Sequence, residues 1–262
     1  MGVSALTPAL DKAEPMSRPN LTLTNVSRWF GAVEVLRDIS LAIGDGEFVA
    51  LVGPSGCGKT TLLNILSGDD QPSSGSVDRQ SRMRMVYQQD GLFPWQTVVE
   101  NIALGLRHLI DPAELQSQIG QMVRLIQLEG FEDHYPHQLS GGMRQRVELA
   151  RSLAGKSDIL LLDEPFSSLD YLTRLRLRHE LARLLHERPR TVVLVTHDIE
   201  EAAQLADRVI VLTERPAQIR RELRIRTPRP RDLTQPEVVQ ATRVILAELG
   251  IETEDAIVGE SQ

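Results

Sequence analysis

Residues 47–61 read EFVALVGPSGCGKTT, an apolar run that breaks into a glycine-rich turn. The spacing of Gly53, Gly58, Lys59 and Thr60 fits the pattern G-x-x-x-x-G-K-[ST], between a predicted buried strand and a predicted helix. Glycines let such a loop curl until its N–H groups point at phosphate oxygens, and the following helix adds its positive dipole end. A turn that merely uses glycine is the alternative, and the Lys-Thr pair directly after the last glycine speaks against it. We therefore expect a nucleotide-binding loop formed by Gly53, Pro54, Ser55, Gly56, Cys57, Gly58, Lys59, Thr60 and Thr61.

Two side chains of this loop have predicted roles of their own. Lys59 would neutralise charge on the β- and γ-phosphates, and the Thr60 hydroxyl would ligate a Mg²⁺ ion that bridges the same phosphates. Cys57 is the single cysteine of the chain, which excludes an internal disulfide.

The composition is that of an ordinary soluble domain. The chain has 262 residues, 41% of them hydrophobic, and a net charge of −7, which argues against a general nucleic-acid binder. No run approaches the roughly 20 apolar residues that cross a bilayer, and no apolar signal core follows the N-terminus. We expect the chain to stay in the cytosol.

The N-terminal part predicts a leader and then antiparallel strands. Residues 1–19 mix Pro, Ser, Lys and Glu without periodicity and are expected to be a disordered leader. Residues 21–26 and 33–43 alternate in the manner of strands. Between them lie Trp29 and Phe30. Trp29 is equally compatible with a place in the core, and we choose Phe30 as the π-face that stacks on a nucleotide base.

After Gly68 the sequence predicts a loop over 69–75, a strand over 83–87 that ends at Gln88, and then a helical subdomain over about 92–145. Apolar spacing is helical from Val98 to about Leu128, and Asp111 with Pro112 marks a helix start. Phe93 and Trp95 are either core residues or a contact for a partner protein, and the sequence leaves both open.

Polar residues then stand at the ends of predicted helices and strands in three places. Ser140, Gly141 and Gly142 precede a helix and form a second potential anion site. The buried run 159–162 ends in Asp163, which suits Mg²⁺, and Glu164, which suits a base acting on water. His197 follows the apolar run 191–195; it is either a structural histidine or, as we favour beside a γ-phosphate site, a sensor of phosphate and water.

The C-terminal part offers two weaker signals. Seven arginines lie within 215–231, a pattern that invites a nucleic-acid or lipid interpretation, but interspersed acidic residues favour a solvated strand and loop, followed by a helix over 236–249. His134 and His137 are three positions apart, and no metal site is expected there.

In this order, the motifs resemble the ATP-binding subunit of an ABC transporter over about residues 20–212. The resemblance implies an α/β fold: a P-loop NTPase (RecA-like) core with an antiparallel β subdomain and an inserted helical subdomain, the ABC ATPase cassette. It places the ATP-binding domain at 20–232, with the helical subdomain at about 92–145, and a C-terminal helix and tail at 233–262.

The resemblance also implies a head-to-tail dimer that binds ATP and Mg²⁺. Asp170 would link the two sites. Each ATP would lie between two sets of residues: Lys59, Thr60, Gln88, Asp163, Glu164 and His197 of one chain, and Ser140, Gly141 and Gly142 of the other. Gln88 would contact Mg²⁺ or the attacking water, and Met143, where many relatives carry Gln, is expected to alter packing without loss of activity.

Within the family, the runs around Trp95, Ser140 and Arg229 are similar to the nitrate, sulfonate and taurine importer group. We expect an import ATPase at the cytoplasmic face of the inner membrane, partnered by a second ATP-binding subunit, a permease and a periplasmic binding protein, and with no nucleic-acid partner. The rival is a soluble ABC ATPase that acts on nucleic acid or ribosomes. Such proteins usually carry tandem cassettes or a long coiled-coil insertion, whereas this chain has one cassette and only about fifty residues from Gln88 to Leu139.

Overall fold

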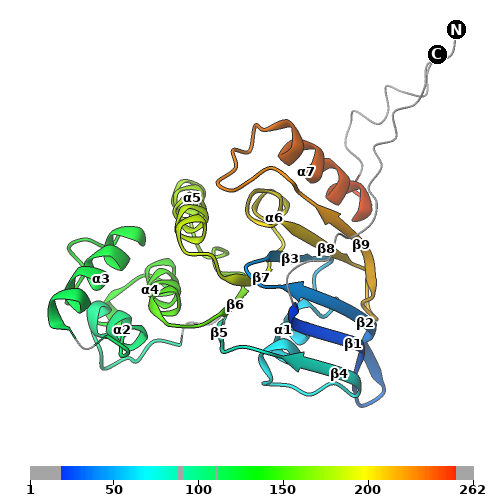
Figure 1. Cartoon of the computed structure of the whole chain (residues 1–262), viewed down its shortest axis with the longest axis horizontal. Helices are drawn as coiled ribbons and strands as arrows, with labels where there is room; N and C mark the ends of the chain where they lie inside the picture. The colour runs from blue at the N-terminus through cyan, green and yellow to red at the C-terminus, as the bar shows by residue number, and fades with distance from the viewer. Residues whose placement is uncertain (1–18, 88–90, 110, 252–262) are drawn as a thin grey trace, which may run out of the picture.

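Two β-sheets organise the chain in the computed structural model, which describes residues 19–87, 91–109 and 111–251 (Figure 1). The smaller sheet is antiparallel and has the order β2-β1-β4, with bounds β1 (Pro19–Phe30), β2 (Val33–Gly44) and β4 (Ser74–Arg79). The larger sheet has the order β5-β6-β7-β3-β8-β9, with bounds β5 (Met83–Val86), β6 (Ile159–Asp163), β7 (Thr191–Val195), β3 (Phe48–Val52), β8 (Arg208–Leu212) and β9 (Ile219–Arg224). Its strands are parallel except for the pair β8 and β9. This is the mixed α/β fold with an antiparallel subdomain that the sequence predicts.

The central strands of the larger sheet are apolar because both of its faces are covered. Every residue of β3, β6, β7 and β8 is buried. Since side chains alternate along a strand, Val49 and Leu51 pack with α1 (Lys59–Ser67) and the smaller sheet, whereas Phe48 and Ala50 pack with the helices of the opposite face. The phosphate-loop helix α1 is thus held between the two sheets.

The remaining helices form two groups in Figure 1. The group at the left consists of α2 (Val98–Gly105), α3 (Pro112–Leu125) and α4 (Gly141–Ala154), with the short η1 (Pro136–Gln138) before α4. The group beside the larger sheet consists of α5 (Tyr171–Glu187), α6 (Ile199–Leu205) and α7 (Pro236–Glu248). Among the described residues, no helix is long and apolar enough to span a bilayer.

Local sequence explains where α2 and α3 begin. Thr97 caps α2 and forms a capping box with Glu100, and Asp111 caps α3 with Pro112 in its first turn, as predicted. The helical spacing over 98–128 therefore belongs to two helices, and the first of them ends at Gly105. Gly105 packs closely against α4, since a Cβ at this position would lie 2.3 Å from the Arg151 carbonyl oxygen.

The structure corrects the predicted loop over 69–75. β4 begins at Ser74 and pairs with β1 through backbone hydrogen bonds. Most of its side chains are polar and exposed, so it lacks the apolar alternation by which strands are found in a sequence. Similarly, Trp29 and Phe30 belong to the end of β1 instead of a connection between strands.

The predicted solvated character of the arginine-rich segment is wrong at its end. Arg231 is buried and donates hydrogen bonds to main-chain carbonyl groups, among them that of Ala206 at 2.6 Å. Arg229 pairs with Asp207 at 2.9 Å. The two arginines fasten the segment that leads into α7 to the end of α6, a contact that charge patterning along the sequence cannot reveal.

Candidate nucleotide-binding and hydrolysis site

The phosphate loop joins β3 to α1 at the carboxyl edge of the larger sheet. Gly56 and Gly58 have φ of +71° and +125°, values that L side chains rarely adopt, and a Cβ on Gly58 would lie 2.8 Å from Val35 Cγ1. No described side chain caps α1, so its first N–H groups are available to an anion. Buried Lys59 donates from Nζ to the carbonyl oxygens of Gly53 at 2.8 Å and Pro54 at 2.9 Å. The loop thus places the Lys59 cation next to the start of α1, which has no side-chain cap.

A hollow of about 570 Å³ opens over this loop. It is lined by Phe30, Val33, Val35, Ser55, Gly56, Gly58, Lys59, Thr60, Thr61, Glu164 and Arg215. Phe30 stands at its rim with 49% of the residue exposed, and the Arg28 guanidinium carbon lies 4.3 Å from the ring centroid. The hollow is therefore lined by an aromatic ring in one part and by the residues of the phosphate loop in another. Cys57 and Pro54 do not line it; Cys57 is buried behind the loop.

Asp163 lies at the end of β6 beside α1. The Thr60 hydroxyl donates to Asp163 Oδ1 at 3.4 Å, and the carboxylate is buried. Burial raises the pKa of Asp163, although the hydrogen bond from Thr60 and the charge of Lys59 oppose the shift. A bound cation would favour the ionised carboxylate, and a hydroxyl with one carboxylate is the sparse set of hard oxygen donors that Mg²⁺ uses when phosphates complete its shell.

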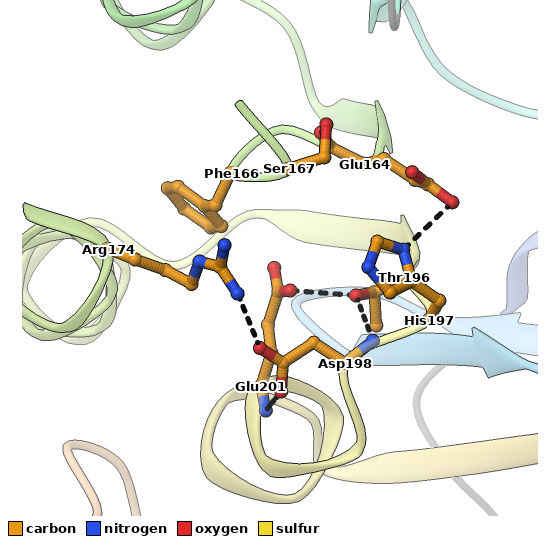
Figure 2. Close-up of a pocket in the computed structure, with 8 residues that line it drawn as sticks. All are labelled: Glu164, Phe166, Ser167, Arg174, Thr196, His197, Asp198 and Glu201. Carbon is orange, nitrogen blue, oxygen red and sulfur yellow. Dashed lines mark hydrogen bonds and ion pairs between the residues drawn. The ribbon is translucent and has the colours of Figure 1, made fainter. Parts of the chain in front are cut away.

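Glu164 and His197 face each other across the ends of β6 and β7 (Figure 2). His197 Nδ1 lies 3.2 Å from Glu164 Oε1. Glu164 has a positive φ of +48°, uncommon for a residue with a side chain, and its N–H donates to the Val195 carbonyl oxygen at 2.9 Å. This fixed turn aims the Glu164 carboxylate at the hollow, while most of the His197 side chain remains exposed.

The other predicted site residues lie outside the hollow. Ser140 caps α4 by accepting a hydrogen bond from the Met143 N–H at 3.3 Å, and Asp170 caps α5 by accepting one from the Thr173 N–H at 3.0 Å. Gly141 is exposed, whereas Gly142 approaches the loop between β6 and α5 so closely that a Cβ would lie 3.1 Å from the Ser168 carbonyl oxygen. In Figure 1, α4 belongs to the helical group, away from α1. Gln88 lies outside the described residues.

No independent metal centre is found in the described part of the chain, where no group of three or more His, Cys, Asp or Glu could hold an ion. The His134 and His137 rings pack beside Phe131 and Tyr135, with centroid distances of 5.0 and 5.9 Å.

The structure adds two residues that the sequence did not single out. Arg215, in the loop after β8, lines the hollow and donates to the Gly56 carbonyl oxygen. Gln145 of α4 is 5% exposed and binds the carbonyl group of Glu164 through its amide. Neither stands in a pattern whose spacing indicates its contact, because both contacts join segments far apart in the sequence.

Comparison with known proteins places this geometry in a family. The model of the ABC transporter family matches residues 36–167. The aliphatic sulfonates import ATP-binding protein SsuB 1 of Rhodococcus jostii is 46% identical over 218 residues, 80% of this chain and 85% of that protein. The nitrate import ATP-binding protein NrtC of Synechococcus elongatus is 45% identical over 213 residues, 77% of this chain and 32% of that longer protein.

A solved structure agrees with these relatives. The dimeric post-hydrolysis state of the ATP-binding cassette MJ0796, bound to ADP and Pi, aligns with a TM-score of 0.68 and 33% identity over 79% of this chain and 99% of that one. Fold similarity and sequence similarity agree over most of the chain. The chain belongs to the ATP-binding subunits of ABC transporters, ATP hydrolases whose turnover serves transport.

Proposed function

We propose that this subunit energises uptake of a small anion, such as nitrate, a sulfonate or taurine, through a membrane permease. The observation that carries the proposal is the hollow over the phosphate loop, faced by Glu164 with His197 beside it. Import is supported by the names of relatives that are 45 to 46% identical, which act on aliphatic sulfonates and nitrate.

The hollow suggests a role for each of its groups. The loop N–H groups and Lys59 hold the phosphates of ATP, and the base stacks on Phe30. Thr60 and Asp163 hold Mg²⁺, which would neutralise charge on the phosphates. Glu164 takes a proton from the attacking water, and His197 orients that water and the terminal phosphate. Gln88 is proposed to contact the same water or Mg²⁺.

A second subunit completes the site in this proposal. Ser140, Gly141 and Gly142 form the start of α4, which the Ser140 side chain caps, yet they do not line the hollow of their own chain. A head-to-tail dimer brings this helix start to the phosphates of the other subunit, with Asp170 between the two sites. The MJ0796 cassette, whose structure is dimeric, supports this arrangement.

The permease contact is proposed at the segment before α2. Trp95 is 70% exposed and packs against Phe93 with a centroid distance of 5.5 Å. An apolar ring held in solvent is suited to a protein partner. The subunit would then lie on the cytoplasmic face of the inner membrane, fed from the other side by a periplasmic binding protein, and it would have no nucleic-acid partner.

Transport by the reconstituted complex tests this proposal. Wild type, Lys59→Ala and the control Lys156→Ala are each combined with permease and binding protein in vesicles that contain ATP. We expect nitrate or an alkanesulfonate to accumulate with wild type and Lys156→Ala only, because Lys156 is exposed and Lys59 is the cation of the phosphate loop. In a direct titration, Lys59→Ala should weaken ATP binding by about a hundredfold, the equivalent of one or two charged hydrogen bonds. Unchanged ATP affinity would contradict the assignment of the loop, and ATP turnover without uptake of any of these anions would contradict the substrate class.

A further inference from the structure

Arg174 of α5 bridges two loops that approach the nucleotide site from different directions. Its Nη2 donates to the Leu169 carbonyl oxygen at 3.0 Å, and its Nη1 donates to Asp198 Oδ2 at 3.2 Å. Leu169 belongs to the loop 167–170, which ends at Asp170. Asp198 directly follows His197. One planar guanidinium therefore joins the loop 167–170 to the segment 196–198, and its rigid fork suits such a double contact.

The segment 196–198 is held on its other side by α6 (Figure 2). Asp198 caps α6 by accepting a hydrogen bond from the Glu201 N–H at 3.0 Å, and its own N–H donates to Thr196 Oγ1 at 2.9 Å. The Thr196 hydroxyl in turn donates to Glu201 Oε2 at 2.7 Å. Both neighbours of His197 are thus fixed by hydrogen bonds, so the position of its ring follows the position of this segment.

Little free volume separates the two loops. The hollow between them measures only about 10 Å³, roughly the space of one water molecule, and is lined in part by Ser167, Arg174, His197 and Asp198. Close-packed groups joined by charged hydrogen bonds cannot shift independently without losing contacts. A displacement of the loop 167–170 is therefore passed to His197.

We propose that Arg174 is a positioning residue that couples the two ATP sites of the dimer by joining the loop 167–170 to His197. This inference rests on the proposed function, in which Asp170 lies between the sites and His197 serves hydrolysis within its own chain. Closure around ATP at one site moves the loop, and Arg174 transmits that movement to the histidine of the other site. In this proposal, the Arg174 contacts keep His197 Nδ1 within 3.2 Å of Glu164 Oε1, the arrangement that hydrolysis uses.

Arg174 can be removed without leaving a buried charge unpaired. Asp198 also pairs with Arg178, which is almost fully buried, so the aspartate keeps one cationic partner after the loss of Arg174. Substituting Arg178 instead would leave the buried Glu201 without its cationic partner and threaten the fold. The matched control is Arg183 on the same helix, which is exposed and pairs with Glu180 and Glu187.

The experiment compares Arg174→Ala, Arg174→Lys and Arg183→Ala as full-length proteins. We measure ATP affinity by titration, ATP turnover against ATP concentration, and thermal stability. Both Arg174 variants should lose about ten- to hundredfold in kcat, the effect of a misplaced catalytic group. Their ATP affinity should stay within about twofold of wild type, and their Hill coefficient for ATP should fall to 1. Lysine should not rescue, because one ammonium group cannot reproduce the planar double contact.

Several results would overturn the inference. Turnover and cooperativity equal to those of Arg183→Ala would show that the bridge transmits nothing. A fall in kcat with an unchanged Hill coefficient would contradict coupling between the sites. Parallel losses of ATP affinity and melting temperature would assign Arg174 to the fold alone. If wild type itself neither binds nor hydrolyses ATP, the proposed function fails, an outcome distinguishable from all of these.

Discussion

Gln145 of α4 donates a hydrogen bond of 2.9 Å from its side-chain amide to the main-chain carbonyl group of Glu164. Its amide oxygen accepts hydrogen bonds from the N–H and the hydroxyl of Ser168. The helix α4, which Ser140 caps, is therefore tied within one chain to the residue placed to act on water and to the loop before Asp170. A movement of α4 would therefore shift both Glu164 and the loop before Asp170.

The first prediction concerns Gln145→Met, which keeps the volume of the side chain and removes its amide. The Glu164 carbonyl group and Ser168 would lose buried partners, so the free energy of unfolding should fall by about 1 to 3 kcal/mol. We also expect kcat to fall more than ATP affinity, since Glu164 would lose a support and Lys59 would not. Urea unfolding and ATP turnover measure the two effects. Gln121→Met, at an exposed position of α3, is the control; equal behaviour of the two variants would show that the Gln145 contact has no energetic role.

The interaction of Gln145 also shows where prediction from sequence stops. The central strands could be predicted because parallel strands covered on both faces are continuous apolar runs, as at 48–52 and 159–162. Asp163, Glu164 and His197 could be placed together because all three follow such runs and the carboxyl ends of parallel strands share one edge. Gln145 stands within a polar stretch, and nothing in its spacing specifies a hydrogen-bond partner nineteen positions away.

The missed features share a dependence on contacts between distant segments. β4 is held by backbone pairing with β1. Because this pairing needs no apolar side chains, Ser74–Arg79 shows no apolar alternation in the sequence. Arg231 is buried because carbonyl groups at the end of α6 and around Ile225 converge on it. An arginine in an arginine-rich segment looks solvated until the fold supplies those acceptors.

The second prediction concerns Glu164→Gln. The substitution keeps the shape of the side chain and removes the base, so ATP should still bind while turnover falls by about 10²- to 10⁴-fold. Because ATP would no longer be consumed, it should hold two subunits together. Light scattering with ATP and Mg²⁺ at high protein concentration reports the mass, and a monomer under these conditions would contradict the two-subunit site. Glu200→Gln, at an exposed position of α6, should turn over ATP like wild type.

The third prediction concerns Trp95→Ala. Since Trp95 is exposed, its loss should leave the fold and the basal ATPase activity of the isolated subunit within a few-fold of wild type. Assembly with the permease should weaken, or hydrolysis should proceed without transport, because an exposed aromatic anchor would be missing from the interface. Uptake and ATPase assays on the same reconstituted vesicles separate these outcomes. An unfolded free subunit would place Trp95 in the core and refute the interface.

The last prediction concerns the pH dependence of stability through Glu201. Burial raises the pKa of Glu201 from 4.5 to about 7, while the charge of Arg178 and the hydrogen bond from Thr196 act in the opposite direction. A raised carboxyl pKa means that the folded state binds a proton that the unfolded state has released. The associated stabilisation is complete below about pH 4.5 and is lost as the pH rises through about 7.

Glu201→Gln removes this titration while keeping a neutral side chain of the same shape. Relative to this variant, wild type should lose unfolding free energy between about pH 4.5 and 7, by an amount of the order of 3 kcal/mol at most, and the difference should be constant at higher pH. Urea unfolding at closely spaced pH values measures it, with the exposed neighbour variant Glu200→Gln as the control that should leave this pH dependence in place. If wild type instead gains stability over Glu201→Gln as the pH rises, attraction to Arg178 exceeds the cost of burial, and Glu201 is an ionised partner of that arginine throughout.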